Sequence, residues 1–338
     1  MLVVAALVGG IAYWTLTDHD GTPDAGPAST PYAGPATATP EAGPATTVTA
    51  TIPAGKTPAG VAVDPDTHTV YATNDAGNTL SVIDPVARTV TATIPVGSAP
   101  IGVAVDPGAQ TVYAANVNSG SVSVIDAVSR TVTAAIPVGG SPVGVAVDPG
   151  THAVFVTNSA DGTVSVIDPT ARTVTATIPG KGWGGVAVDP GTHTVYTTNS
   201  ADGTVSVIDA ASHTVTATIA AGRSPVRVAV DPGTRTVYTT NSDDGTVSVI
   251  DPSSRTVTAT IPVGTRLWDV AVDPGTHTVY TTNFADSTVS VIDAASRTVT
   301  ATIPVGKTPN GVAVDPGTHT VYTANYDDDT LSLIKPPG

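Results

Sequence analysis

The sequence VAVDP occurs seven times at nearly constant spacing, and this repetition limits the possible folds more than any other feature. The copies begin at Val61, Val103, Val145, Val186, Val228, Val270 and Val312, so that successive steps are 42, 42, 41, 42, 42 and 42 residues. A period of about forty residues is typical of solenoids and propellers. In such proteins each repeat is one small unit that buries its apolar faces against its neighbours.

Each copy contains four short runs rich in valine and threonine. In the fifth copy they read VRVAVD, RTVYTTN, TVSVID and TVTATI, and the segments DPGT, SDDG and PSS separate them. Runs of this length between turn-forming residues are typical of strands joined by tight hairpins. Hydrophobic residues make up 41% of the chain but aromatic residues only 4%, so the interior must consist mainly of small β-branched side chains. We predict that each repeat is a four-stranded antiparallel meander.

The two ends of the array predict a closed ring. The array opens with a fourth-run motif, TVTATIP at Thr47–Pro53, and stops after a third-run motif, TLSLI at Thr330–Ile334. The first motif therefore supplies the strand that the last repeat lacks, and this leaves no blade incomplete. We expect an all-β, seven-bladed propeller over residues 47–338, monomeric, with the N-terminal strand closing the last blade.

Two segments precede the array. Residues 1–17 carry no charged side chain and are followed by DHD, and they lack the basic start and the A-x-A site of a cleaved signal peptide. We expect a membrane anchor that places the propeller outside the cytoplasm, or a secreted protein if the segment is cleaved. In residues 18–46 the motifs TPDAGPA, TPYAGPA and TPEAGPA recur, and this composition predicts an extended linker.

The second and third runs of the copies resemble those of a known repeat. VYATN at Val70–Asn74, VFVTN at Val154–Asn158 and VYTTN at Val195–Asn199 are each followed by TVSVID or a close variant. They resemble the YVTN-type β-propeller repeat, and the resemblance covers about residues 47–334. It implies the propeller fold. It implies no single activity, because that family includes surface-layer antigens, secreted or periplasmic proteins and sensor domains.

The predicted meander sorts the connections onto two faces. Loops from the second to the third run, and from the fourth run to the next copy, emerge on one face, which we call the top. The remaining turns emerge on the bottom. An aspartate begins almost every bottom turn, and we expect it to cap backbone N–H groups there. Arginines close many of the turns between third and fourth runs, and we expect them to pair with those aspartates: Arg88, Arg130, Arg172, Arg255 and Arg297.

Other polar residues also recur once per copy. Five histidines share one turn position, and we expect them at an outer edge, on separate blades, too far apart to bind one metal ion: His68, His152, His193, His277 and His319. An asparagine ends every second run and is expected to form an Asx turn. The next loop is acidic in most copies, and Asp327, Asp328 and Asp329 leave calcium binding open as an alternative to a solvated loop.

The copies differ most where the top loops enter the first run. The residue before VAV is glycine in five copies, but it is Arg227 in the fifth and Asp269 in the sixth. We expect these two to form an ion pair at the mouth of the central channel. Trp and Arg are favoured at binding hot spots. The candidate ligand-binding residues are Trp183, Arg227, Arg266, Trp268, Asp269 and Asn310. The alternative is that the tryptophans and the ion pair only plug the channel.

These features favour a non-catalytic, membrane-tethered binding module or sensor domain that takes a protein, peptide or glycan on its top face and needs no cofactor or metal. A lactonase or sugar oxidoreductase would need several converging acidic, His or Asn side chains, and the one glutamate, Glu41, lies in the linker. Single-stranded nucleic acid could stack on top-face tryptophans. However, the net charge of −15 opposes that partner. There is no cysteine for thiol chemistry.

Overall fold

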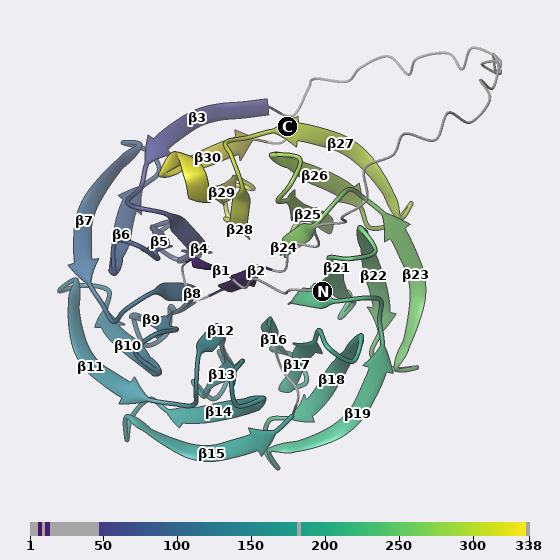
Figure 1. Cartoon of the computed structure of the whole chain (residues 1–338), viewed down its shortest axis with the longest axis horizontal. Coiled ribbons are helices and arrows are strands. Elements are labelled where there is room, and N and C mark those ends of the chain that lie inside the picture. The colour runs from purple at the N-terminus through teal and green to yellow at the C-terminus, as the bar shows by residue number, and fades with distance from the viewer. Residues whose placement is uncertain (1–5, 9–10, 14–46, 181–183, 336–338) are drawn as a thin grey trace.

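Seven four-stranded antiparallel sheets surround a central axis in the computed structural model (Figure 1). The structure describes residues 6–8, 11–13, 47–180 and 184–335. Each sheet is one blade, and consecutive strands within it pair from the axis outward. The prediction of an all-β seven-bladed propeller is confirmed, and the blade boundaries follow the sequence repeat.

The strands form four concentric positions. The innermost strands are β4 (Pro58–Val63), β8 (Pro100–Asp106), β12 (Pro142–Val147), β16 (Val186–Asp189), β20 (Pro225–Val230), β24 (Leu267–Asp273) and β28 (Pro309–Val314). The second strands are β5 (Val70–Asn74), β9 (Thr111–Asn116), β13 (Val154–Asn158), β17 (Thr194–Asn199), β21 (Val237–Asn241), β25 (Thr278–Asn283) and β29 (Val321–Asn325). We number the blades 1 to 7 in this order.

The two outer positions complete each blade. The third strands are β6 (Thr79–Asp84), β10 (Ser121–Asp126), β14 (Thr163–Asp168), β18 (Thr204–Asp209), β22 (Thr246–Asp251), β26 (Thr288–Asp293) and β30 (Thr330–Lys335). The outermost strands of blades 1 to 6 are β7 (Thr89–Pro95), β11 (Thr131–Pro137), β15 (Thr173–Pro179), β19 (Thr214–Ala220), β23 (Thr256–Pro262) and β27 (Thr298–Pro304). The outermost strand of blade 7 is β3 (Thr47–Pro53). The short 3-10 helix η1 (Tyr326–Asp328) lies in the top loop of the same blade, between β29 and β30.

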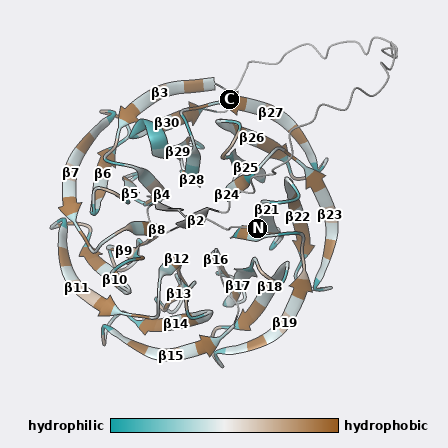
Figure 2. Ribbon diagram, viewed as in Figure 1, coloured by the Kyte–Doolittle hydropathy of each residue, from teal (hydrophilic) through white to brown (hydrophobic). Residues whose placement is uncertain are grey.

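The core lies between neighbouring blades. Tyr71, Leu80 and Ile94 of blade 1 pack against Val112 and Ile125 of blade 2, and equivalent clusters recur around the ring. Apolar and polar residues alternate along the outermost strands (Figure 2), where one side chain in two faces the next blade. Small β-branched side chains fill these interfaces because each blade presents two apolar faces that must be covered.

Strand β3 closes the ring as predicted. It pairs antiparallel with β30 in a register that matches Thr47 with Lys335 and Ile52 with Leu331. Ile52 also belongs to the buried cluster that joins blade 7 to Val70 of blade 1. The first and last parts of the array therefore lie side by side (Figure 1).

Little of the segment before the array is described. Residues 6–8 and 11–13 form the short antiparallel strands β1 (Ala6–Val8) and β2 (Ile11–Tyr13). Among the residues that the structure describes, no helix has the length and apolar character that crossing a bilayer requires. The expected linker at residues 18–46 lies outside the described residues.

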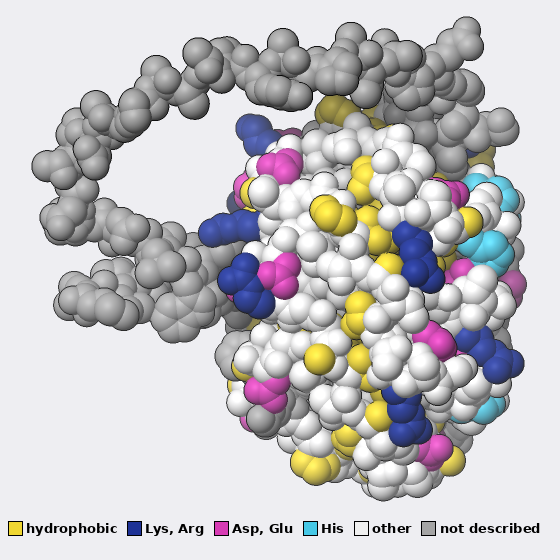
Figure 3. Space-filling view, turned by 90° about the vertical axis from the view of Figure 1, so that its right-hand side faces the viewer, with side chains coloured by type: hydrophobic (Ala, Val, Ile, Leu, Met, Phe, Trp, Pro, Cys, Tyr) yellow, Lys and Arg dark blue, Asp and Glu magenta, His cyan; other side chains and the backbone are white. Residues whose placement is uncertain are grey.

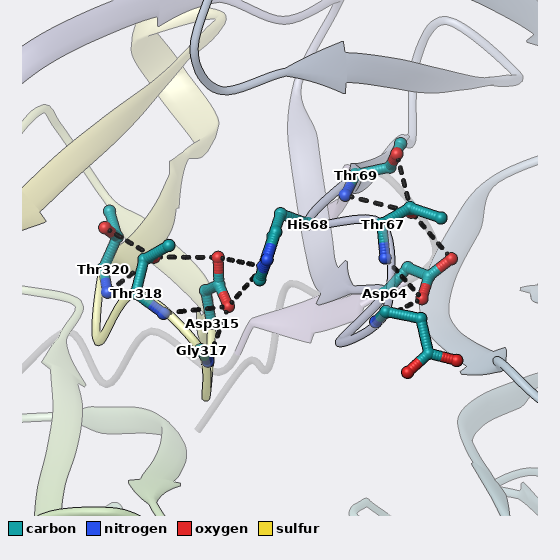
Figure 4. A network of polar contacts seen from close by, with 9 residues as sticks. Asp64, Thr67, His68, Thr69, Asp315, Gly317, Thr318 and Thr320 are labelled. Atoms are coloured by element: carbon teal, nitrogen blue, oxygen red, sulfur yellow. Dashed lines mark hydrogen bonds and ion pairs between the residues drawn. The ribbon is translucent and has the colours of Figure 1, made fainter.

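The bottom turns between first and second strands contain the expected caps and an additional contact between blades. In blade 7, Asp315 accepts hydrogen bonds from the N–H of Gly317 and the hydroxyl of Thr318. Its carboxylate also lies 3.0 Å from Nδ1 of His68, which belongs to blade 1 (Figure 4). One aspartate thus caps its own turn and binds the neighbouring blade.

This contact corrects the expected position of the histidines. They lie in the turns that join the innermost strands to the second strands, not at an outer edge. Histidine side chains gather along one face of the disc (Figure 3). Each histidine is 42–47% exposed, whereas its aspartate partner on the preceding blade is at most 1% exposed. The histidines therefore connect neighbouring blades. The five pairs are His68–Asp315, His152–Asp106, His193–Asp148, His277–Asp231 and His319–Asp273.

The arginines of the outer bottom turns do not form the predicted ion pairs. Arg130 instead donates from Nη1 to the backbone oxygen of Thr91 on the preceding blade, and Arg297 donates to that of Thr258 in the same way. The aspartates of these turns accept hydrogen bonds from their own turn, as Asp126 does from the N–H of Ser129. Because local N–H groups already satisfy the carboxylates, the guanidinium groups reach across to the preceding blade.

The prediction of Asx turns at the second-strand asparagines is also wrong. Asn74 is buried and donates from Nδ2 to the hydroxyls of Thr79 and Ser81 on the third strand. The same pair of contacts recurs at Asn158, Asn199, Asn241, Asn283 and Asn325. This asparagine is therefore a clamp between strands.

Acid is expected to destabilise the fold partly through Asp315. Burial alone would raise its pKa, but hydrogen bonds from Thr318, Gly317 and His68 hold the pKa below the ordinary 3.8. The folded state therefore binds this proton more weakly than the unfolded state does. The resulting stability is complete above the ordinary pKa and is lost as pH falls through the lower, folded pKa.

Urea unfolding between about pH 5 and pH 2.5 measures this effect. Asp315→Asn should be less stable than the wild type at the upper end of this range, and its free energy of unfolding should depend less on pH. Equal slopes in both proteins would contradict the assignment.

Candidate functional site

The innermost strands of neighbouring blades approach so closely that most can carry only glycine beside the channel. A Cβ on Gly60 would lie 2.2 Å from the backbone oxygen of Ile101 on the next blade, and one on Gly102 would lie 2.3 Å from that of Val143. Such distances are far inside van der Waals contact. The repeated glycine is therefore required by packing, and Arg227 and Asp269 are the departures that need another explanation.

Threonine hydroxyls connect these strands from one blade to the next. Thr73 accepts the N–H of Gly60 and donates to the backbone oxygen of Ile101. The same arrangement joins Arg227 to Trp268 through Thr240, and it joins Asp269 to Asn310 through Thr282. The backbones of the candidate residues on blades 5, 6 and 7 are thus fixed relative to one another.

Arg227 lies against the tryptophan of the next blade. Its guanidinium carbon is 5.6 Å from the centre of the Trp268 ring, within the range of a cation–π interaction. Trp268 is half-buried, and its ring centre is 5.9 Å from that of Phe284. Nε1 of Trp268 is buried and has no hydrogen-bond partner in the described part of the chain. The indole is thus held between an aromatic side chain and a cation.

The predicted ion pair between Arg227 and Asp269 is not formed. Both side chains line the same cavity, but no ion pair joins them among the described residues. Asp269 instead accepts the N–H of Val270 at 2.9 Å and that of Val312 on blade 7 at 3.0 Å. The N–H of Val312 thus holds the Asp269 carboxylate against blade 7. For this reason it does not meet the guanidinium on blade 5.

The charges nevertheless influence each other at longer range. Burial raises the pKa of Asp269, and Arg227 and the N–H groups of Val312 and Val270 oppose that rise. Burial also lowers the pKa of Arg227 below its ordinary value, and Asp269 opposes that change. In both groups the loss of hydration outweighs the attraction of the other charge.

A cavity of about 120 Å³ lies between the innermost strands at this level. Its polar side chains come from blades 5 to 7: Arg227, Asp269 and Asn310. The opposite side is formed by apolar side chains of blades 1 to 3, which include Ala59, Ile101 and Val143. The channel mouth, by which we mean these six residues, is therefore polar on one side and apolar on the other.

The other predicted site residues lie in different surroundings. Asn310 is only 3% exposed. Arg266 is exposed in the loop before β24, and its backbone oxygen accepts the N–H of Phe284. Trp183 lies outside the described residues. The structure thus brings together four of the six candidates: Arg227, Trp268, Asp269 and Asn310.

The acidic top loops have a structural role. Asp244 accepts hydrogen bonds from the backbone N–H and from Nε of Arg223. Asp328 accepts the N–H of Lys307, and Asp329 accepts that of Thr57 on a different loop. Among the described residues no group of three or more His, Cys, Asp or Glu side chains is arranged to hold a metal ion.

Sequence reasoning missed the residues that position the candidate site. Thr240 and Thr282 fix the backbones of Arg227 and Asp269, and Phe284 supports the indole of Trp268. The threonine signal was present as the fourth letter of VYTTN, but a repeated residue attracts attention to the fold and not to a site. Phe284 is more distinctive, since the chain contains only two phenylalanines.

Comparison with known proteins supports the fold. No known protein family matches the sequence, and no curated protein matches it. Among solved structures, hydrazine synthase from Kuenenia stuttgartiensis superposes with a TM-score of 0.75 at 21% identity, over 83% of this chain and 96% of that chain. At this identity the similarity shows a shared propeller fold and carries no activity over.

Proposed function

We propose that this chain is a non-catalytic binding module or sensor domain of the YVTN type, tethered outside the cytoplasm, whose channel mouth recognises a protein, peptide or glycan. The observation that carries the proposal is that Arg227 is partly buried without an ion-pair partner in the described part of the chain. This side chain replaces a glycine, is partly removed from water, and has no carboxylate within ion-pair distance in the described residues. A desolvated charge without a partner costs free energy of folding, and such groups are typical of sites where a ligand supplies the partner.

Defined arrays of glycans and of synthetic peptides test the proposal with the full chain. Arg227→Met should lose the signal that the wild type gives, because the cation at the channel mouth is removed. Arg223→Met is the matched control, since Arg223 lies on the same face but is already bound to Asp244. Identical signals from the wild type and Arg227→Met would rule out the channel mouth as the binding site.

A stability measurement separates recognition from the alternative that these residues only plug the channel. We expect Arg227→Met to leave the free energy of unfolding unchanged or to increase it by about 1 kcal/mol, since methionine packs on Trp268 without the cost of desolvating a charge. A plug would instead lose contacts, so thermal or urea unfolding should show a clear loss. A decrease of about 2 kcal/mol or more would favour the plug.

A further inference from the structure

The geometry of the channel mouth indicates the chemistry of what enters it. This inference rests on the proposed function, because it concerns the same site. The cavity, at about 120 Å³, is well below the roughly 300 to 1,000 Å³ of typical small-molecule pockets. It therefore has room for a terminal group of a ligand.

The charged side of the cavity favours one negative charge. The guanidinium of Arg227 makes a single hydrogen bond among the described residues, from Nη1 to the backbone oxygen of Val226, and at 3.5 Å this bond is at the limit of the usual range. The other guanidinium N–H donors have no acceptor among the described residues. Asp269 does not compete for them, because the N–H groups of Val270 and Val312 bind its carboxylate.

The planar guanidinium of Arg227 favours a carboxylate as the bound anion. A guanidinium presents parallel N–H groups that match the two oxygens of a carboxylate, and such charge-assisted pairs are among the strongest hydrogen bonds. Asp269 in the same cavity opposes a second negative charge, so a dianion such as a phosphate monoester fits less well. Among the residues that the structure describes, Arg227 is the only basic side chain that lines the cavity.

The apolar side of the cavity specifies the rest of the terminal group. Ala59, Ile101 and Val143 line the cavity opposite Arg227, and Ala59 and Ile101 belong to a small buried apolar cluster on this side. An aliphatic group against these side chains would lose contact with water at no polar cost. We infer that the channel mouth binds a terminal carboxylate on a short aliphatic body, carried by a free small acid or by the C-terminal residue of a peptide.

Calorimetric titration of the full chain tests this inference with four probes. They are propionate, propionamide, the tripeptide Gly-Gly-Val with a free carboxylate, and the same tripeptide with an amidated C-terminus. We expect at least one acid to bind about tenfold or more tightly than its amide. Similar affinity for both acids would identify a free acid as sufficient, whereas binding of the tripeptide alone would identify a C-terminus.

Substitutions connect this binding to Arg227. Arg227→Met should weaken acid binding by about tenfold or more, and Arg227→Lys should restore only part of it, because lysine keeps the charge but lacks the paired donors. Arg223→Met should bind the acids as the wild type does. Equal binding of acid and amide, no binding of either acid, or binding unaffected by Arg227→Met would each overturn the inference.

Competition separates failure of this inference from failure of the proposed function. If a partner found on the arrays needs Arg227 but neither acid displaces it, the carboxylate inference fails and the proposed function stands. If no array signal depends on Arg227, the proposed function fails as well.

Discussion

Deletion of residues 47–53 is expected to abolish the cooperative thermal transition of the propeller. This change removes β3, so β30 loses its outer partner over a paired stretch that runs from Lys335 to Thr330. It also removes Ile52, which is 1% exposed in the cluster between blades 7 and 1. The ring would then open between these blades, and the unpaired edge of β30 would favour aggregation. Calorimetry and size-exclusion chromatography measure both effects.

Single substitutions show whether the closing interface is packed as tightly as the others. Ile52→Ala should cost about 2 to 5 kcal/mol of unfolding free energy, as expected for truncating a buried isoleucine. Ile94→Ala, at the equivalent position of blade 1, should cost a similar amount. Val215→Ala, which is 41% exposed on β19, should change stability little. A sharp transition in the deletion variant, with wild-type elution, would contradict ring closure by β3.

The fold could be predicted in detail because repetition makes a weak signal strong. A single TVSVID run is an ambiguous apolar segment, whereas seven aligned copies establish the period, the number of blades and the strand that each end of the array lacks. The pairing of β3 with β30 was predicted from the number of runs at each end of the array. The prediction needed no knowledge of side-chain packing.

The roles of the repeated polar residues were predicted less well, because their partners lie on other strands or blades. Asn74 was expected to bond within its own turn, but a buried amide at a strand end is surrounded by the hydroxyls of the next strand. Arg130 and His68 similarly reach the preceding blade. Local sequence contains no information about which turn of a neighbouring blade lies within reach.

For the candidate site too, the sequence predicted positions better than contacts. Departure from the repeat located Arg227 and Asp269 correctly beside the channel. Their adjacency in the ring suggested an ion pair, but adjacency does not reveal that the N–H of Val312 lies closer to the Asp269 carboxylate. The identities of side chains that face a channel can be predicted from a repeat. Competition between backbone and side-chain partners requires coordinates.

Gly60 occupies in blade 1 the position that Arg227 occupies in blade 5, and its substitution is the second change for which we expect a large effect. We expect Gly60→Ala to cost about 3 kcal/mol or more of unfolding free energy, which is at or above the upper end for overpacking. The new methyl group would lie 2.2 Å from the backbone oxygen of Ile101, and that oxygen already accepts the hydroxyl of Thr73 at 2.6 Å. Since the obstacle is backbone, relief requires blades 1 and 2 to separate.

Gly191→Ala is the matched control for this substitution. Gly191 lies in a bottom turn, and the nearest atom to its added Cβ, Oδ1 of Asp189, is 3.4 Å away, which is an ordinary contact. Its free energy of unfolding should remain within about 0.5 kcal/mol of the wild type. If Gly60→Ala proved equally neutral in urea unfolding, close packing would not explain the repeated glycine. The contrast with Arg227 and Asp269, and with it the reason to regard the channel mouth as a site, would then be much weaker.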